Sequence, residues 1–145
     1  MKASRSMADD VSVPLQWLAY ALGDLDAARM RSGRRQRPRI VAFHAQEAAE
    51  KAMKAALILS GMRPDRTHDL DELRNALPIG WTVKRRHRSL ARLSDYAAER
   101  RYPDDANPVT PIEAATAVRQ AMAVVRIIRE DFERRGVSTA RIEPR

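Results

Sequence analysis

Apolar side chains recur every three or four residues in four stretches of this chain, the spacing that places them on one face of a helix. The first stretch carries Leu15, Leu18, Leu22 and Leu25. Pro14 is tolerated in the first turn of a helix, and Ser32-Gly33 interrupts the pattern just beyond Met30. The pattern predicts a first helix that ends at about Met30.

The second stretch runs from Pro38 to Ser60, and Gly61 can adopt the left-handed conformation that ends many helices. Its apolar stripe consists of Val41, Ala45, Ala48, Ala52, Ala55 and Leu59. Alanine has little side chain, so a neighbouring helix can approach closely along this stripe. We therefore predict a second helix that packs tightly on another.

A short helix is predicted before the third long one. Asp69, with Glu72 three residues later, has the spacing of a helix N-terminus. Its apolar residues are Leu70, Leu73 and Leu77, ahead of the breakers Pro78 and Gly80. A third main helix is then expected from Lys84 to Arg101, stopped by Pro103. Its inward residues are Leu90, Leu93 and Ala97.

The fourth stretch has the clearest start signal. Thr110, Pro111 and Glu113 supply a capping hydroxyl, a first-turn proline and the reciprocal carboxylate of a capping box. The helical period continues to Gly136 through Ile112, Ala115, Val118, Met122, Val125, Ile128 and Phe132. We predict a fourth helix over this whole stretch.

These elements predict an all-α protein, an up-down four-helix bundle with a short extra helix between the second and third main helices. A chain of 145 residues fits one domain. We expect a flexible leader over residues 1–11, the bundle over 12–136 and a flexible tail over 137–145.

Composition limits the cellular compartment and the binding partners that we expect. Cysteine is absent, and no stretch approaches the roughly 20 apolar residues that cross a bilayer, so we expect a cytoplasmic protein without membrane contact. The formal net charge is +8, carried mostly by arginine, which pairs with phosphate. A polyanionic partner and a general arginine bias both explain this charge.

Some residues of the predicted helices and loops also form recognisable motifs. The run from Phe43 to Ala55, FHAQEAAEKAMKA, resembles the second helix of HEPN domains, the higher eukaryote and prokaryote nucleotide-binding family. Further matches follow in the family's order: Trp17, Ala21 and Asp24 before this run, then Thr67-His68-Asp69-Leu70 and Arg101-Tyr102-Pro103 after it. The resemblance covers about Leu15 to Phe132.

The resemblance implies a four-helix bundle that often forms homodimers. Small stand-alone HEPN proteins are typically encoded beside a minimal nucleotidyltransferase, in two-gene modules that behave like toxin and antitoxin. Related branches are metal-independent ribonucleases, in which an arginine and a histidine four to six residues apart cut RNA. Other branches bind nucleotides or act as scaffolds, so the fold alone does not fix the activity.

The histidines argue against the nuclease branch. His44, His68 and His87 all precede Arg101, so none follows it where that branch places its histidine. Arg39 and His44 have the right separation, but they lie on the second helix and point about 140° apart. They remain weak catalytic candidates. An enzyme is thus the less favoured class, and if this is one, it is a metal-independent ribonuclease.

The second helix offers a binding site instead. His44, Glu47, Lys51 and Lys54 form one polar stripe that could grip a phosphate or hold a partner helix. The pairs Glu47–Lys51 and Glu50–Lys54 have the favourable i, i+4 order, worth about 0.2–0.5 kcal/mol each. A purely solubilising role for both pairs, with His44 in a half-buried groove, explains the stripe equally simply.

Two further motifs have alternative roles. Asp69 caps the short helix while His68 is exposed, or His68 faces the stripe and shares its ligand. Arg101 stabilises a helix end, or it contacts phosphate while Tyr102 stacks on a base or packs at a dimer face. Together the predicted nucleotide- or RNA-binding residues are His44, Glu47, Lys51, Lys54, His68, Asp69, Arg101 and Tyr102.

Two basic clusters could also bind RNA: Arg29, Arg31, Arg34, Arg35, Arg37 and Arg39, and then Lys84, Arg85, Arg86, Arg88 and Arg92. Scattered histidines predict no metal site, and the few dispersed glycines predict no phosphate loop or other cofactor site. The sequence therefore favours a nucleotide- or RNA-binding HEPN protein that acts with a nucleotidyltransferase. A metal-independent endoribonuclease and a non-catalytic dimeric adaptor are the alternatives.

Overall fold

The regular elements of the computed structural model are all helices within the residues it describes, which are 10–30, 37–86, 89–97 and 108–145. Three are long: α2 (Ser12–Arg29), α3 (Pro38–Leu59) and α7 (Pro111–Arg134). Three are short: α4 (Leu70–Ala76), α5 (Val83–Arg86) and α6 (Ala91–Ser94). The predicted all-α fold is confirmed.

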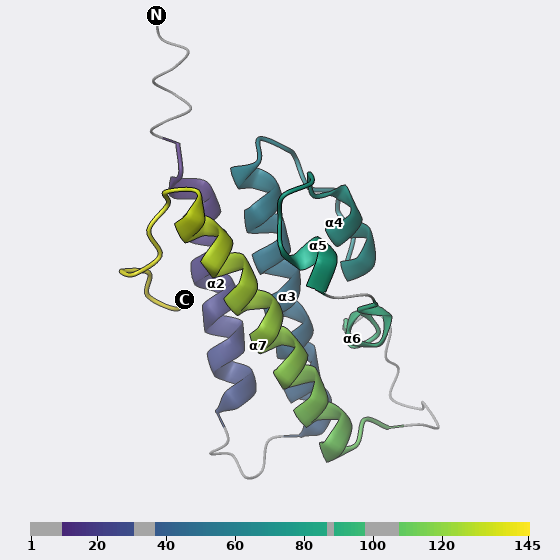
Figure 1. The fold of residues 1–145 in the computed structure, drawn as a ribbon. Coiled ribbons are helices and arrows are strands. Elements are labelled where there is room, and N and C mark those ends of the chain that lie inside the picture. The colour runs from purple at the N-terminus through teal and green to yellow at the C-terminus, as the bar shows by residue number, and fades with distance from the viewer. Residues whose placement is uncertain (1–9, 31–36, 87–88, 98–107) are drawn as a thin grey trace, which may run out of the picture.

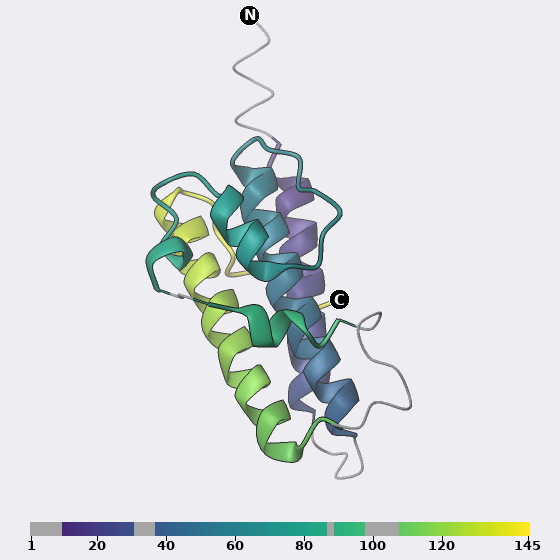
Figure 2. The same ribbon diagram turned by 90° about the vertical axis from the view of Figure 1, so that its right-hand side faces the viewer.

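The three long helices lie side by side (Figure 1), and the rotated view shows α3 between α2 and α7 (Figure 2). The α2 helix runs opposite to α3 and α7. The short helices α4, α5 and α6 cover the side of α3 and α7 that faces away from α2, as the rotated view shows (Figure 2). The segment that holds them carries the chain from the end of α3 back toward the start of α7.

Small residues of α3 form the centre of the core. Its fully buried alanines are Ala42, Ala45, Ala48, Ala49, Ala52, Ala55 and Ala56. Leu18 and Ala21 of α2 are equally buried against them. Alanine costs no side-chain entropy and lets helix axes approach, so α2 and α3 can pack closely along this seam. It confirms the predicted alanine contact and fixes which face of α3 is left for polar residues.

The start of α7 forms as predicted, but its buried face is rotated. The Thr110 hydroxyl accepts from the Glu113 amide at 3.1 Å, and the Glu113 carboxylate accepts from the Thr110 amide at 2.9 Å. Ile112, expected inside, is 78% exposed, and Met122 is 37% exposed. The buried stripe at this end consists of Ala114, Ala117, Ala121 and Val124. Close packing on the alanines of α3 favours these small residues over the larger ones.

The predicted third helix over Lys84–Arg101 is wrong for the part that is described. Two single turns, α5 and α6, replace it, and hydrogen bonds with α4 hold the segment around α6 in place. The Leu90 amide donates to Asp71 Oδ1 at 2.8 Å, and the Ser94 hydroxyl accepts from the Leu70 amide at 2.9 Å. The inward placement of Leu90, Leu93 and Ala97 is nevertheless confirmed. Residues 87–88 and 98–101 lie outside the described part.

The segment after α7 lies against the bundle. Thr139 is buried, and its amide and hydroxyl donate to Glu133 at 2.6 and 2.8 Å. The Arg145 amide donates to the Ala19 carbonyl of α2 at 2.9 Å. A Cβ at Gly23 would overlap the Arg145 carbonyl, so the glycine permits this close approach.

No helix in the described residues is both long and apolar enough to cross a membrane.

Candidate functional site

Asp24 is an acidic residue at the contact between α2 and α3. Its Oδ1 lies 2.9 Å from Nδ1 of His44, and its Oδ2 accepts a 2.6 Å hydrogen bond from the Lys51 ammonium. His44 and Lys51 are two helical turns apart, so both project from the same face of α3. Their side chains are 30% and 28% exposed. We call Asp24, His44 and Lys51 the seam cluster.

The Asp24 carboxylate determines which nitrogen of His44 carries a proton and favours the charged form of Lys51. Because a carboxylate only accepts hydrogen bonds, Nδ1 of His44 carries a proton, and a neutral ring keeps Nε2 as an acceptor. Burial by itself would lower the pKa of the Lys51 ammonium, but the hydrogen bond to Asp24 outweighs burial and raises that pKa. The seam cluster therefore holds an oriented imidazole beside a lysine that a carboxylate already neutralises.

Glu50 is the centre of a second cluster on the adjoining face of α3. Its Oε1 accepts from Nε2 of Gln46 at 2.9 Å and lies 2.9 Å from Nδ1 of His68. Its Oε2 accepts from the Lys54 ammonium at 2.8 Å. Burial alone would raise the pKa of Glu50, but the bonds from Lys54, Gln46 and His68 outweigh burial and lower it. We call Gln46, Glu50, Lys54 and His68 the Glu50 cluster.

Glu47 lies between the two clusters. Its Oε1 is 3.7 Å from the Lys51 ammonium, which is closer to Asp24. Burial is the largest cause that raises the pKa of Glu47, and the neighbouring carboxylates of Glu50 and Asp24 add to it. One ligand atom each of Glu47, Glu50 and His68 lie within 4.8 Å of one another. Glu47 is thus the carboxylate of this face with the weakest compensation by a cation.

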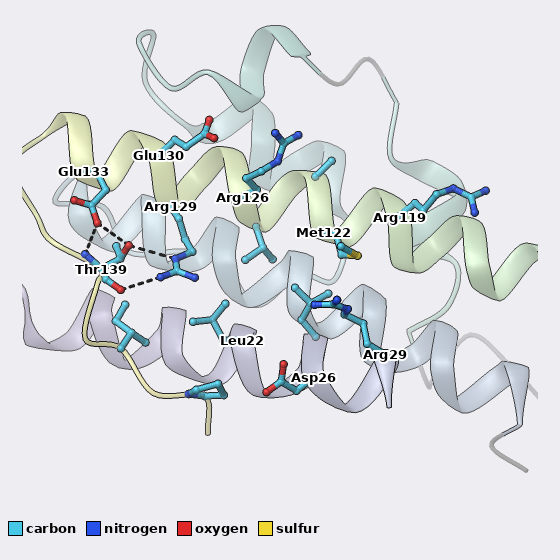
Figure 3. Close-up of a pocket in the computed structure, with 15 residues that line it drawn as sticks. Leu22, Asp26, Arg29, Arg119, Met122, Arg126, Arg129, Glu130, Glu133 and Thr139 are labelled. Atoms are coloured by element: carbon cyan, nitrogen blue, oxygen red, sulfur yellow. Dashed lines mark hydrogen bonds between the residues drawn. The ribbon is translucent and has the colours of Figure 1, made fainter. Parts of the chain in front are cut away.

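A groove of about 800 Å³ lies on another side of the molecule, between α2, α7 and the C-terminal segment (Figure 3). Apolar residues of its lining include Leu22, Leu25, Met122, Val125 and Ile142. Its charged residues are Asp26, Arg29, Arg119, Arg126, Arg129, Glu130 and Glu133. An apolar floor with a charged rim can take a ligand that has both flat apolar faces and ionic groups.

The arginines of this groove differ in their contacts. Arg129 donates to the Thr139 hydroxyl at 3.3 Å and carbonyl at 2.8 Å, so it anchors the C-terminal segment (Figure 3). Arg119 contacts the Thr116 hydroxyl at 3.1 Å. Among the described residues, no carboxylate forms an ion pair with Arg29, Arg119 or Arg126. We call these three residues the groove arginines.

The predicted site residues fall into distinct environments. His44, Glu47, Lys51 and Lys54 do share one side of α3, but Lys54 is buried on Glu50 and is not displayed. His68 contacts Glu50 on this side, as the second of our two alternatives expected, while its side chain is 43% exposed, as the first expected. Arg39 is exposed at the start of α3.

Asp69 is a helix cap, since its Oδ1 accepts from the amides of Asp71 and Glu72. Its side chain is therefore committed to the start of α4. Arg101 and Tyr102 lie outside the described residues. The same holds for four members of the basic clusters, Arg31, Arg34, Arg35 and Arg88.

The sequence matches the HEPN domain family over residues 15–131. This chain belongs to the HEPN family. Among solved structures, the HEPN chain is similar to the crystal structure of TT1696 from Thermus thermophilus, at 27% identity and a TM-score of 0.69. The similarity covers 81% of this chain and 97% of that one. No curated protein is detectably similar in sequence. HEPN membership supports a nucleotide- or RNA-related role in general.

Sequence reasoning missed several members of these sites. Asp24 matched the HEPN pattern, but its contact with the second helix depends on a residue pair far apart in the chain. Gln46 and Glu50 were assigned to no site because nothing local shows that a loop covers them. Arg119 and Arg126 are two turns apart on α7, and this spacing could have indicated a second, basic stripe.

Proposed function

We propose that this HEPN protein is a cytoplasmic accessory protein that binds nucleotide or RNA and acts with a nucleotidyltransferase in a module of the toxin–antitoxin type. In this role it is a homodimer and not itself an enzyme. HEPN membership supports the nucleotide-related part of the proposal. The absence of a histidine after Arg101 supports the non-catalytic part.

One observation carries the binding role. The groove arginines have no carboxylate partner among the described residues, whereas Lys51 and Lys54 of α3 are within 3 Å of one. A guanidinium without an acidic partner pairs with phosphate at little cost, because no existing ion pair has to be broken. The apolar floor between α2 and α7 offers base faces a surface to lie on. Asp26 and Glu130 also line the groove and limit its net positive charge.

Titration with ATP and with a short single-stranded RNA, each at a low and a high salt concentration, tests this proposal. We expect saturable binding that weakens as salt rises, because phosphate contacts release counterions. Absence of both affinity and salt dependence would leave the dimeric adaptor as the better description. Co-purification of the protein with a nucleotidyltransferase encoded beside it tests the partnership separately.

The second candidate function is a metal-independent endoribonuclease, and the seam cluster favours it. A carboxylate that holds Nδ1 of a histidine leaves Nε2 to move a proton, the arrangement of many general bases. His44 is partly exposed, so an RNA 2′-hydroxyl could reach it. Lys51, which donates to the same carboxylate, could stabilise charge on a phosphate.

RNA cleavage measured in EDTA separates the two candidates. The accessory role predicts no cleavage by the wild-type protein. Cleavage that His44→Ala abolishes, while His68→Ala retains it and both variants keep the helicity of the wild type, would replace the accessory role by the nuclease. His68 is the matched control because its ring also contacts a single carboxylate, that of Glu50.

A further inference from the structure

Two carboxylates and an imidazole converge on the polar side of α3. Glu47 and Glu50 are one helical turn apart, so their side chains lie on the same face of the helix. His68 comes from the loop before α4, and its Nδ1 meets Oε1 of Glu50 at 2.9 Å. The three ligand atoms lie within 4.8 Å of one another, and Glu50 is buried. The set is assembled by the fold, since its members come from two separate segments.

We propose that Glu47, Glu50 and His68 bind a divalent transition-metal ion of the zinc or manganese class. One imidazole nitrogen and two carboxylate oxygens are ligands that these ions share, whereas calcium and magnesium prefer oxygen alone. Ligand atoms around a bound zinc ion lie about 2.0–2.2 Å from the metal. Small movements of the two partly exposed side chains, Glu47 and His68, would close the present separation to that range.

Gln46 provides an independent indication of a ligand. Its side chain is fully buried and reaches the same place, where Nε2 donates to Glu50 at 2.9 Å and to the His68 carbonyl at 3.3 Å. Its Oε1 is buried without a hydrogen-bond partner within the described part of the chain. Half a turn of the amide would bring this oxygen to the cluster as a fourth ligand, and the metal would then replace the two hydrogen bonds that Nε2 now donates to Glu50 and to the His68 carbonyl.

The charges around the cluster leave room for a cation. Asp24, Glu47 and Glu50 face the ammonium groups of Lys51 and Lys54, so the carboxylates outnumber the ammoniums. Lys54 holds Oε2 of Glu50 and thereby leaves Oε1 as the oxygen that faces His68.

The ion would take the place of the proton between His68 and Glu50. A neutral His68 ring then carries its proton on Nε2 and binds the metal through Nδ1, while a protonated ring first loses one proton to solvent. Binding should therefore weaken as the pH falls, as it does for metal sites that contain histidine. This site is independent of the proposed RNA binding, because neither groove arginine nor seam residue is a ligand.

Calorimetric titration of the tag-free protein with zinc chloride, and separately with manganese chloride, tests the site. We expect saturable binding of at least one of these ions. His68→Ala and Glu47→Gln should each weaken it by more than about tenfold, since even the loss of a residue behind a ligand costs that much. Both residues are partly exposed, so the variants should keep their helicity, which circular dichroism checks.

His44→Ala is the matched control, because this histidine of α3 also contacts a single carboxylate, that of Asp24, but lies outside the cluster. It should bind the ion as the wild type does. Absence of saturable binding of either ion would overturn the proposal. Binding that His44→Ala removes, or that His68→Ala and Glu47→Gln both leave unchanged, would overturn it as well. RNA is absent from this titration, so its outcome does not depend on the proposed function.

Discussion

The polar side of α3 and the groove between α2 and α7 both carry cationic side chains, but their cations are compensated differently. On α3, Lys51 and Lys54 each lie within 3 Å of a buried or half-buried carboxylate. Around the groove, Arg29 and Arg126 have no such partner among the described residues. A cation that a carboxylate already holds contributes mainly to the fold. One without a partner is available to a polyanion.

The largest difference between the two regions should appear in stability. Glu50→Ala leaves the buried Lys54 ammonium without its carboxylate, and Gln46 and His68 without their acceptor. Removal of one partner of a buried ion pair typically costs about 3–5 kcal/mol. Urea unfolding should therefore show a loss of that size.

Arg126→Ala is the matched comparison in the groove. It removes no ion pair in the described part of the chain, so the free energy of unfolding should stay within about 0.5 kcal/mol of wild type. Equal losses for the Glu50 and Arg126 variants would show that α3 and the groove do not differ as described.

The seam cluster should give a smaller loss than the Glu50 cluster. Asp24→Ala removes the acceptor of Lys51 and the partner of His44, two contacts to charged or polar groups. Hydrogen bonds to charged groups contribute about 1.5–3 kcal/mol, and the partial exposure of both partners lets water replace part of this. A loss of about 1–2 kcal/mol in urea unfolding is expected. A loss as large as that of Glu50→Ala would mean that water reaches the seam cluster no better than it reaches the Glu50 cluster.

The smallest effect concerns two glutamates one turn apart, whose pKa values shift in opposite directions from 4.5. The raised pKa of Glu47 means that its ionised form disfavours folding above that pKa, so Glu47→Gln should stabilise the protein at pH 7 by less than about 1 kcal/mol. This gain should vanish below pH 4.5, where the folded and unfolded states both protonate Glu47.

The lowered pKa of Glu50 has the opposite effect on stability. Its contribution to stability is complete above pH 4.5 and is lost as the pH falls through the folded-state pKa. Glu50→Gln should therefore be less stable than wild type at pH 7, and the two should converge in acid. Stability curves of the two variants that run in parallel over this pH range would contradict these assignments.

Much of this architecture could be predicted from local signals. The end of α3 at Gly61, the capping box of α7 and the Glu50–Lys54 pair all depend on residues within a few positions of one another. Each was correct because backbone conformation and i, i+4 contacts are set locally.

Features that depend on distant residues could not be predicted in this way. The burial of Glu50 depends on the loop that carries His68, and the role of Asp24 depends on the register between α2 and α3. The prediction of the third helix failed for the same reason, because the backbone amide of Leu90 donates to Asp71, which belongs to another helix. The groove exists only once α7 and the C-terminal segment are placed beside α2.

The affinity of two variants for a short single-stranded RNA, measured over a range of salt concentrations, tests the difference between the two regions most directly. The double variant Arg29→Gln/Arg126→Gln removes two groove arginines, and Lys51→Gln removes a cation of the seam cluster. We predict that the double variant binds more weakly and that its salt dependence falls by about 0.7 units per lost phosphate contact, while Lys51→Gln stays close to wild type. Unchanged binding by the double variant, or a loss in Lys51→Gln that equals or exceeds it, would contradict this account.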